Sequence, residues 1–117
     1  AGDFVEHVIL PESADGDPAL FQPHALAVVD IDGDGLLDLV TGERFWAHVP
    51  PDANIADPAA LYWFEHVRDG SGDTFVPHLI DDASGVGTQV TVGDIDGDRR
   101  PDVVVGNKKG AFVFLQQ

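Results

Sequence analysis

One pattern of acidic residues occurs twice in this chain and limits what it can fold into. Residues 30–38 read DIDGDGLLD and residues 94–102 read DIDGDRRPD, with Asp at positions 1, 3, 5 and 9 of each copy. Carboxylates this close repel one another unless a cation lies among them, and calcium takes six to eight oxygen ligands in flexible geometry. We therefore expect one Ca²⁺ ion in each loop, two in the chain, rather than two solvated acidic turns.

The residues around the two loops exclude the helical classes of calcium site. An EF-hand needs a Glu at position 12 and a helix on each side, whereas position 12 is Thr41 in one copy and Val105 in the other. The flanking segments are short, rich in β-branched residues and bounded by Gly, which is typical of buried strands. The same flanks count against a dockerin-type loop, so each loop joins two strands.

Length and charge exclude several classes of protein. At 117 residues the chain is one small domain or part of a larger repetitive one. It has 21 acidic and 6 basic residues, a net charge of −15, which argues against a nucleic-acid partner because phosphate binding needs clustered Lys and Arg. No apolar run approaches the roughly 20 residues that a membrane span requires. We expect neither a nucleic acid nor a membrane as partner.

The chain contains no cysteine, so neither disulfides nor thiolate metal sites stabilise the fold. Calcium is then the expected cross-link. The chain begins at Ala1 without a signal peptide, as a mature or trimmed form would. Carboxylate loops of this kind suit the calcium concentrations found outside cells, and we expect an extracellular or cell-surface protein.

The repeat extends beyond the loops. Residues 4–9 (FVEHVI) match residues 75–80 (FVPHLI) at an offset of 71, and residues 60–64 (ALYWF) resemble residues 111–115 (AFVFL) at an offset of 51. The loops themselves are 64 residues apart, so the first copy carries two insertions, one between residues 9 and 30 and one between residues 42 and 60. The repeated unit is therefore four short strands.

With these strands, residues 29–42 and 93–106 resemble the FG-GAP and VCBS repeats of integrin α-subunit propellers and many secreted bacterial proteins. The resemblance covers nearly the whole chain. It implies an all-β fold in which each repeat is a four-stranded antiparallel propeller blade whose calcium loop joins the innermost strand to the second. Carried onto this sequence, it implies as metal ligands Asp30, Asp32, Asp34, the carbonyl of Leu36 and Asp38, then Asp94, Asp96, Asp98, the carbonyl of Arg100 and Asp102.

One position departs from the pattern. Arg99 stands where the first copy has Gly35, and this position commonly needs a positive φ. We therefore expect the second site to be weaker, or its loop to be reshaped.

The resemblance predicts a single unit, residues 1–117, of two blades. The first blade spans residues 24–80, with strands at 24–29, 37–41, 60–65 and 74–80 from the innermost outward. The second spans residues 88–117, with strands at 88–93, 102–106 and 110–116, and lacks an outer strand. Residues 1–9 contain a segment that matches the outer strand 74–80, so we expect it to complete the last blade.

Two blades cannot close a propeller, which normally has four to eight. We expect residues 4–9 of one copy to complete the last blade of a neighbouring copy, giving a head-to-tail homo-oligomer of three or four copies, or a filament. The alternative is that the chain is a fragment of a longer propeller. The sequence leaves ring, filament and fragment open.

Both insertions fall on the rim opposite the calcium loops, because successive connections alternate between the two rims. Long loops on a rigid scaffold often bind ligands. Loops 10–23 and 43–59 carry candidate residues for a glycan or protein ligand: Arg44, Trp46 and His48, with Phe21, His24 and Phe45 near them. The alternative is that these aromatic residues pack under their own loop or against an adjacent subunit.

We expect a structural or adhesive module, with a lectin-like ligand-binding propeller as the alternative, and no enzyme. No Ser-His-Asp set, catalytic carboxylate pair or phosphate-binding glycine loop is evident. His7 and His78 occupy equivalent positions of the repeat, as structural residues do. Tyr62, Trp63, Phe112 and Phe114 lie in strands that we expect to be buried between blades.

Overall fold

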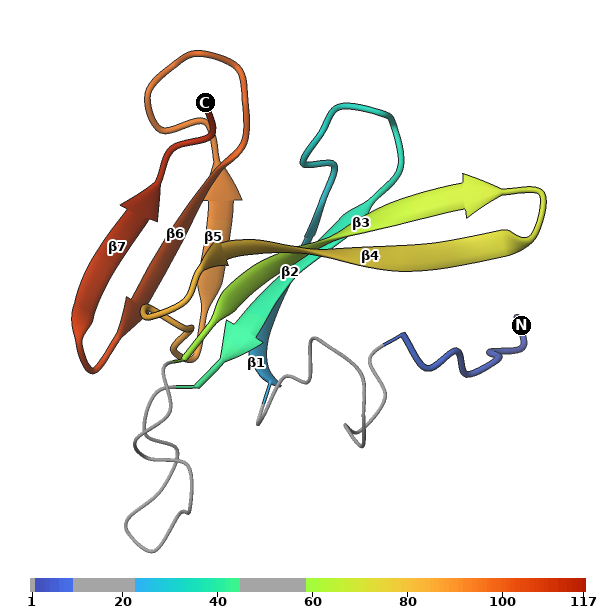
Figure 1. The fold of residues 1–117 in the computed structure, drawn as a ribbon, viewed down its shortest axis with the longest axis horizontal. Helices are drawn as coiled ribbons and strands as arrows, with labels where there is room; N and C mark the ends of the chain where they lie inside the picture. Colours follow the sequence, from blue (N-terminus) through green and yellow to red (C-terminus); the bar gives the residue numbers. More distant parts are fainter. Residues whose placement is uncertain (1, 10–22, 45–58) are drawn as a thin grey trace, which may run out of the picture.

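The computed structural model describes residues 2–9, 23–44 and 59–117 (Figure 1). These ranges form two antiparallel sheets that lie side by side. The first sheet, blade 1, has the order β1 (Pro23–Val29), β2 (Asp38–Glu43), β3 (Leu61–Asp69), β4 (Gly72–Asp81). The second, blade 2, has the order β5 (Val90–Gly93), β6 (Asp102–Asn107), β7 (Gly110–Phe114). The predicted all-β fold of two antiparallel blades is confirmed.

Each blade is a meander in which consecutive strands pair. Pairing of β1 with β2 brings Val29 opposite Asp38, and pairing of β5 with β6 brings Gly93 opposite Asp102. The acidic segments 30–37 and 94–101 are therefore the connections between the first two strands of each blade. No helix in the described ranges is long and apolar enough to cross a membrane.

The main core lies between the two blades. Val40 and Leu61 of blade 1 are fully buried in one cluster with Val103 and Val105 of blade 2. Trp63, Phe112 and Phe114 are partly buried against this cluster, which confirms that they are core aromatics. Burial of these side chains from both sheets is the main favourable contribution to holding the blades together.

The segment between β4 and β5 crosses from one blade to the other along the start of β1 and the end of β2. The Val86 N–H donates to the carbonyl of Glu43 (2.8 Å), and Nδ1 of His24 donates to the carbonyl of Gly87 (3.0 Å). A Cβ at Gly87 would lie 2.0 Å from the carbonyl oxygen of Gly106. Only glycine fits there, so this contact fixes how closely the linker approaches β6.

The register corrects one part of the sequence alignment. Leu39 pairs with Phe64 in blade 1, and the equivalent Val103 pairs with Phe114 in blade 2. Phe64 therefore corresponds to Phe114 at an offset of 50, and the predicted offset of 51 is wrong. The two segments share aromatic and aliphatic residues at either offset, but a slip of one residue turns every side chain to the opposite face. Only the pairing with the second strand decides the register.

Residues 4–9 form no strand within the single chain, and the side chains of Phe4, Val5 and Val8 are exposed. Blade 2 has three strands, with β7 at its edge. The expectation that residues 4–9 pair with the edge strand of another copy stays a prediction, as do the domain limits drawn from it.

Candidate metal centres

The two acidic loops lie at the same end of their blades, where the innermost strand turns into the second (Figure 1). Short hydrogen bonds from backbone N–H groups to the loop's own carboxylates determine its conformation. Asp30 accepts from Gly33 (2.7 Å) and Gly35 (2.9 Å), Asp32 accepts from Asp34 (3.0 Å), and Asp34 accepts from Leu36 (2.7 Å). These are the local turns that Asp side chains form with residues two or more positions on.

The second loop repeats all four of these bonds. Asp94 accepts from Gly97 (2.6 Å) and Arg99 (3.0 Å), and Asp96 accepts from the N–H of Asp98 (3.1 Å). The Asp98 carboxylate accepts from the N–H of Arg100 (2.8 Å). The two loops therefore have the same fold, which their sequences specify locally.

The last aspartate of each loop is buried and fastens the loop to the third strand. Asp38 accepts the N–H of Ile31 on one oxygen and the N–H of His66 on the other, both at 2.8 Å. Asp102 accepts in the same way from Ile95 (2.7 Å) and from Gln116 (2.9 Å). The spacing of the motif does not reveal this role, because His66 is 28 residues away in the sequence.

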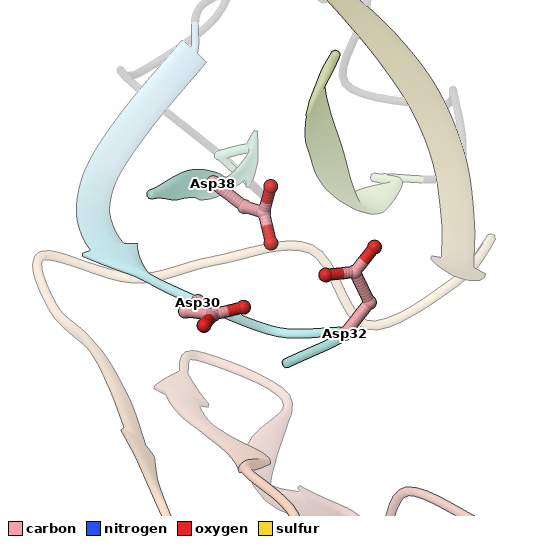
Figure 2. A group of neighbouring side chains, drawn as sticks. All are labelled: Asp30, Asp32 and Asp38. Atoms are coloured by element: carbon pink, nitrogen blue, oxygen red, sulfur yellow. The ribbon is translucent and has the colours of Figure 1, made fainter. Parts of the chain in front are cut away.

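Three carboxylates converge in each loop. Asp30, Asp32 and Asp38 each offer an oxygen atom, and these atoms lie within 4.8 Å of one another (Figure 2). The equivalent residues of the second loop form a second such group: Asp94, Asp96 and Asp102. Donor sets made only of oxygen suit hard cations such as Ca²⁺. Asp34 and Asp98 are not members of these groups, and their ligand roles and those of the Leu36 and Arg100 carbonyls stay predictions.

The charges around Asp32 leave negative potential in the first loop. Loss of hydration raises the pKa of Asp32 first, and the negative charges of Asp34, Asp38 and Glu65 raise it further, against the lowering effect of the Asp34 N–H. A bound cation would offset this repulsion. The first loop is therefore suited to a cation.

The second loop differs at Asp98. Its carboxylate accepts from Nε of Arg100 (2.8 Å), and the Nη2 atom of Arg100 lies 2.5 Å from the same oxygen. The backbone N–H of Arg100, followed by this guanidinium, lowers the pKa of Asp98. The first loop has Leu36 at this position, so only the second carboxylate is held by an internal cation.

Arg99 takes the same backbone conformation as the glycine that it replaces. Its φ is +76°, against +92° for Gly35, and its N–H makes the equivalent hydrogen bond to Asp94. The expectation of a reshaped loop is therefore wrong, because the carboxylate bonds impose the left-handed conformation even on an arginine. A non-glycine residue there costs about 1–2 kcal/mol. The expectation of a weaker second site stays a prediction.

The candidate ligand-binding residues fall mostly outside the described part of the chain: Phe21, Phe45, Trp46 and His48. Arg44 and His24 lie together at the end of blade 1 opposite the acidic loop, with Arg44 Nη1 3.5 Å from His24 Nε2. The backbone of Arg44 also bridges to Val86. Both described residues therefore contact the linker between the blades.

Two family models match the chain. The model of the FG-GAP repeat matches residues 23–54, and the model of the FG-GAP-like repeat matches residues 51–105. The first match contains the loop of Asp30, Asp32 and Asp38, and the second contains the loop of Asp94, Asp96 and Asp102. No curated protein and no solved structure matches the chain.

Proposed function

The chain belongs to the FG-GAP repeat family, and on this premise we propose that it is a calcium-binding β-propeller module with a structural or adhesive role outside the cell. The observation that carries the proposal is the presence of two equivalent groups of three aspartates, each at the same turn of its blade. Repeats of this family occur mainly in extracellular and surface proteins.

The chemistry of the two groups supports calcium over a transition metal. Every member is a carboxylate, with no histidine or cysteine, and hard oxygen ligands on a short flexible loop match the preferences of Ca²⁺. Bound calcium would neutralise the carboxylates that otherwise repel one another. Since the group exists only when the loop is folded, binding would stabilise the native state.

The contacts of the described histidines support a structural role rather than catalysis. His78 donates to Glu65 (2.7 Å) and stacks on Trp63 with ring centroids 4.3 Å apart. His66 donates to Asp73 (3.0 Å) and stacks on the ring of a neighbouring phenylalanine. These pairs link the paired strands β3 and β4.

Calcium titration of the whole chain tests the metal sites. We expect two ions per chain by calorimetry, and a melting temperature that rises with calcium and falls on chelation, since a ligand at 100 times its Kd stabilises by about 2.7 kcal/mol per site. Asp32→Asn and Asp96→Asn should each remove one ion. Asp82→Asn, an exposed aspartate outside both groups, is the control. Absence of binding in millimolar calcium would overturn the proposal.

Arg100 provides a sharper test of the second site. Arg100→Leu copies Leu36 of the first loop and frees Asp98 from its ion pair, so calcium should bind the second site several-fold more tightly. The first site should be unchanged. Arg68→Leu, which removes an arginine paired with Asp73 in the distant hairpin, is the control. Equal affinity in Arg100→Leu and the unmodified chain would show that the guanidinium does not compete with the ion.

We also propose that identical chains assemble head to tail, with residues 4–9 of one copy completing blade 2 of the next in a ring of three or four copies or a filament. In blade 1, Trp63 pairs with His78. Val113 is the counterpart of Trp63 at the offset of 50, and His7 is the counterpart of His78 at the offset of 71. We therefore expect Val113 of one copy to pair with His7 of the next. The other possibility, a fragment of a longer propeller, leaves the chain as a monomer.

A cysteine pair tests this register. His7→Cys combined with Val113→Cys should give disulfide-linked multimers on a non-reducing gel. Glu6→Cys with Val113→Cys is the control, because neighbouring strand residues point to opposite faces. Multimers in neither pair, or equally in both, would contradict the proposed strand pairing.

A further inference from the structure

The two faces of each blade differ, and the repeat lets the faces of the two blades be matched. In blade 1, Val28, Leu39 and Phe64 are cross-strand partners and share one face, which we call the leading face. Ala27, Val40 and Trp63 share the opposite face, the trailing face. The loop offset of 64 and the third-strand offset of 50 give the matching residues of blade 2: Val92, Val103 and Phe114 on its leading face, and Thr91, Val104 and Val113 on its trailing face.

Within the chain, the leading face of blade 2 packs on the trailing face of blade 1. Val103 and Val105 are buried in one cluster with Val40, and Val92 and Trp63 are partly buried against it. Ile31 and Trp63 of blade 1 also line one hollow with Phe114 of blade 2. The structure therefore contains one complete contact between a leading and a trailing face.

The remaining two faces also carry apolar side chains, most of them exposed; Phe64 on the leading face of blade 1 is buried. On the leading face of blade 1, Leu26 is 60% and Val28 55% exposed, whereas their counterparts Val90 and Val92 pack against the core. On the trailing side of blade 2, Ile95 is 55% exposed, whereas its counterpart Ile31 is 6% exposed. Val113 on this face is 52% exposed. Each uncovered apolar side chain thus has a counterpart that the other blade covers.

We infer that the leading face of blade 1 binds the trailing face of blade 2 of a second copy of this chain. The occupant is a second copy because the equivalent pair of faces, the leading face of blade 2 and the trailing face of blade 1, already packs together within the chain. Contiguous apolar patches that are exposed on a protein mark interaction surfaces. The two faces are different surfaces, so the contact is head to tail and leaves one of each face free for a further copy.

This inference rests on the proposed assembly and names the surfaces that it uses in addition to residues 4–9. Leu26→Asp places a negative charge on the leading face of blade 1, and Val113→Asp places one on the trailing face of blade 2. Both side chains are exposed, so the single chain should still fold. By light scattering in calcium, the unmodified chain should form assemblies larger than 12.5 kDa, and each variant should remain a single chain.

Mixing the two variants tests the polarity of the contact. Each variant keeps one intact face, and the two intact faces are complementary, so an equal mixture should form pairs of chains and nothing larger. Val76→Asp is the matched control, since Val76 is an exposed valine of β4 outside both surfaces, and it should assemble like the unmodified chain. Val28→Asp serves as a second leading-face variant if Leu26→Asp fails to fold.

Three results would overturn the inference: a monomeric unmodified chain, unchanged assembly of Leu26→Asp or Val113→Asp, or a mixture that stays monomeric. Calcium titration of the same samples separates this inference from the metal proposal. If the Val113→Asp variant binds two ions per chain and still assembles, the proposed metal sites are supported and the proposed contact surface is wrong. If the variants fail to assemble and neither they nor the unmodified chain binds calcium, the proposed contact surface is supported and the proposed metal sites are wrong.

Discussion

At the level of single residues, the sixth position of the acidic loop shows how far local hydrogen bonds determine backbone conformation. Gly35 and Arg99 have different steric costs at a positive φ, yet both adopt it, because Asp30 and Asp94 accept the N–H of that residue. The second loop is therefore built under strain that the first loop avoids.

We predict that Arg99→Gly raises the free energy of unfolding by about 0.5–1 kcal/mol, because glycine adopts this φ without a Cβ clash. Gly35→Arg should lower it by at least about 1 kcal/mol for the same reason. Chemical denaturation in the presence of a chelator measures both values without the contribution of bound metal. Gly70→Ala, at an uncrowded position with ordinary φ, is the control, and a loss of stability in Arg99→Gly would contradict the strain argument.

At the level of elements, the buried aspartates Asp38 and Asp102 join three parts of each blade: the start of the loop, the start of the second strand, and a residue that lies within β3 in blade 1 and just after β7 in blade 2. Each carboxylate accepts two backbone N–H groups. A buried N–H that loses its acceptor costs about 1–3 kcal/mol. These residues therefore have a structural role that does not depend on the metal.

We predict that Asp38→Ala lowers the stability of the metal-free chain by about 2–4 kcal/mol, since two N–H groups lose their partner. Asp32→Ala should change it by less than about 1 kcal/mol, since Asp32 accepts one N–H at an exposed position. Thermal denaturation with a chelator measures the difference. Similar losses in the two variants would show that Asp38 acts only as a metal ligand.

The turn that follows β4 should make stability depend on pH. The N–H of Ala83, followed by the N–H of Ser84, lowers the pKa of Asp81 despite some loss of hydration. A folded-state pKa below the unfolded value means that the stabilisation is complete above the unfolded pKa. It is lost as pH falls through the folded one.

We therefore expect the stabilisation that Asp81 contributes to the metal-free chain to be lost below about pH 4, the ordinary range of an Asp carboxyl. Asp81→Asn should be less stable than the unmodified chain at pH 7, with the difference shrinking towards pH 3. Denaturant titrations across this range give the comparison. A difference that does not vary with pH would rule out the contribution of the Asp81 charge.

At the level of the whole molecule, the net charge of −15 opposes the compact state. Eight of the 21 acidic residues lie in the two acidic loops, so the two calcium ions that we propose would remove part of this repulsion where it is most concentrated. Salt screens the remainder.

We predict that 150 mM KCl stabilises the metal-free chain relative to low salt by about 1 kcal/mol, or roughly 4 °C in melting temperature. With calcium bound, the salt effect should be smaller. Calorimetric melting in chelator and in calcium, each at two salt concentrations, makes the comparison. An equal salt effect in both conditions would place the dominant repulsion outside the loops.

The sequence predicted the local parts of this protein well, for a physical reason. The turn of each acidic loop depends on hydrogen bonds between residues two to five positions apart, so the motif contains the information. The strands were located because apolar runs end at Gly and Asp. The end of β3 was predicted at residue 65 but lies at Asp69, because pairs with β4, such as Arg68 with Asp73 (2.6 Å), extend a polar hairpin that the apolar pattern does not show.

By itself, the sequence determined the number of blades, their strand order and the position of the two carboxylate loops. Only the tertiary structure decided the register of the third strand, the bonds from Asp38 and Asp102 to His66 and Gln116, and which faces of the blades are covered. These features depend on contacts between residues far apart in the chain. The repeat makes equivalent positions alike in sequence, but position in the fold leaves Ile31 buried and Ile95 exposed.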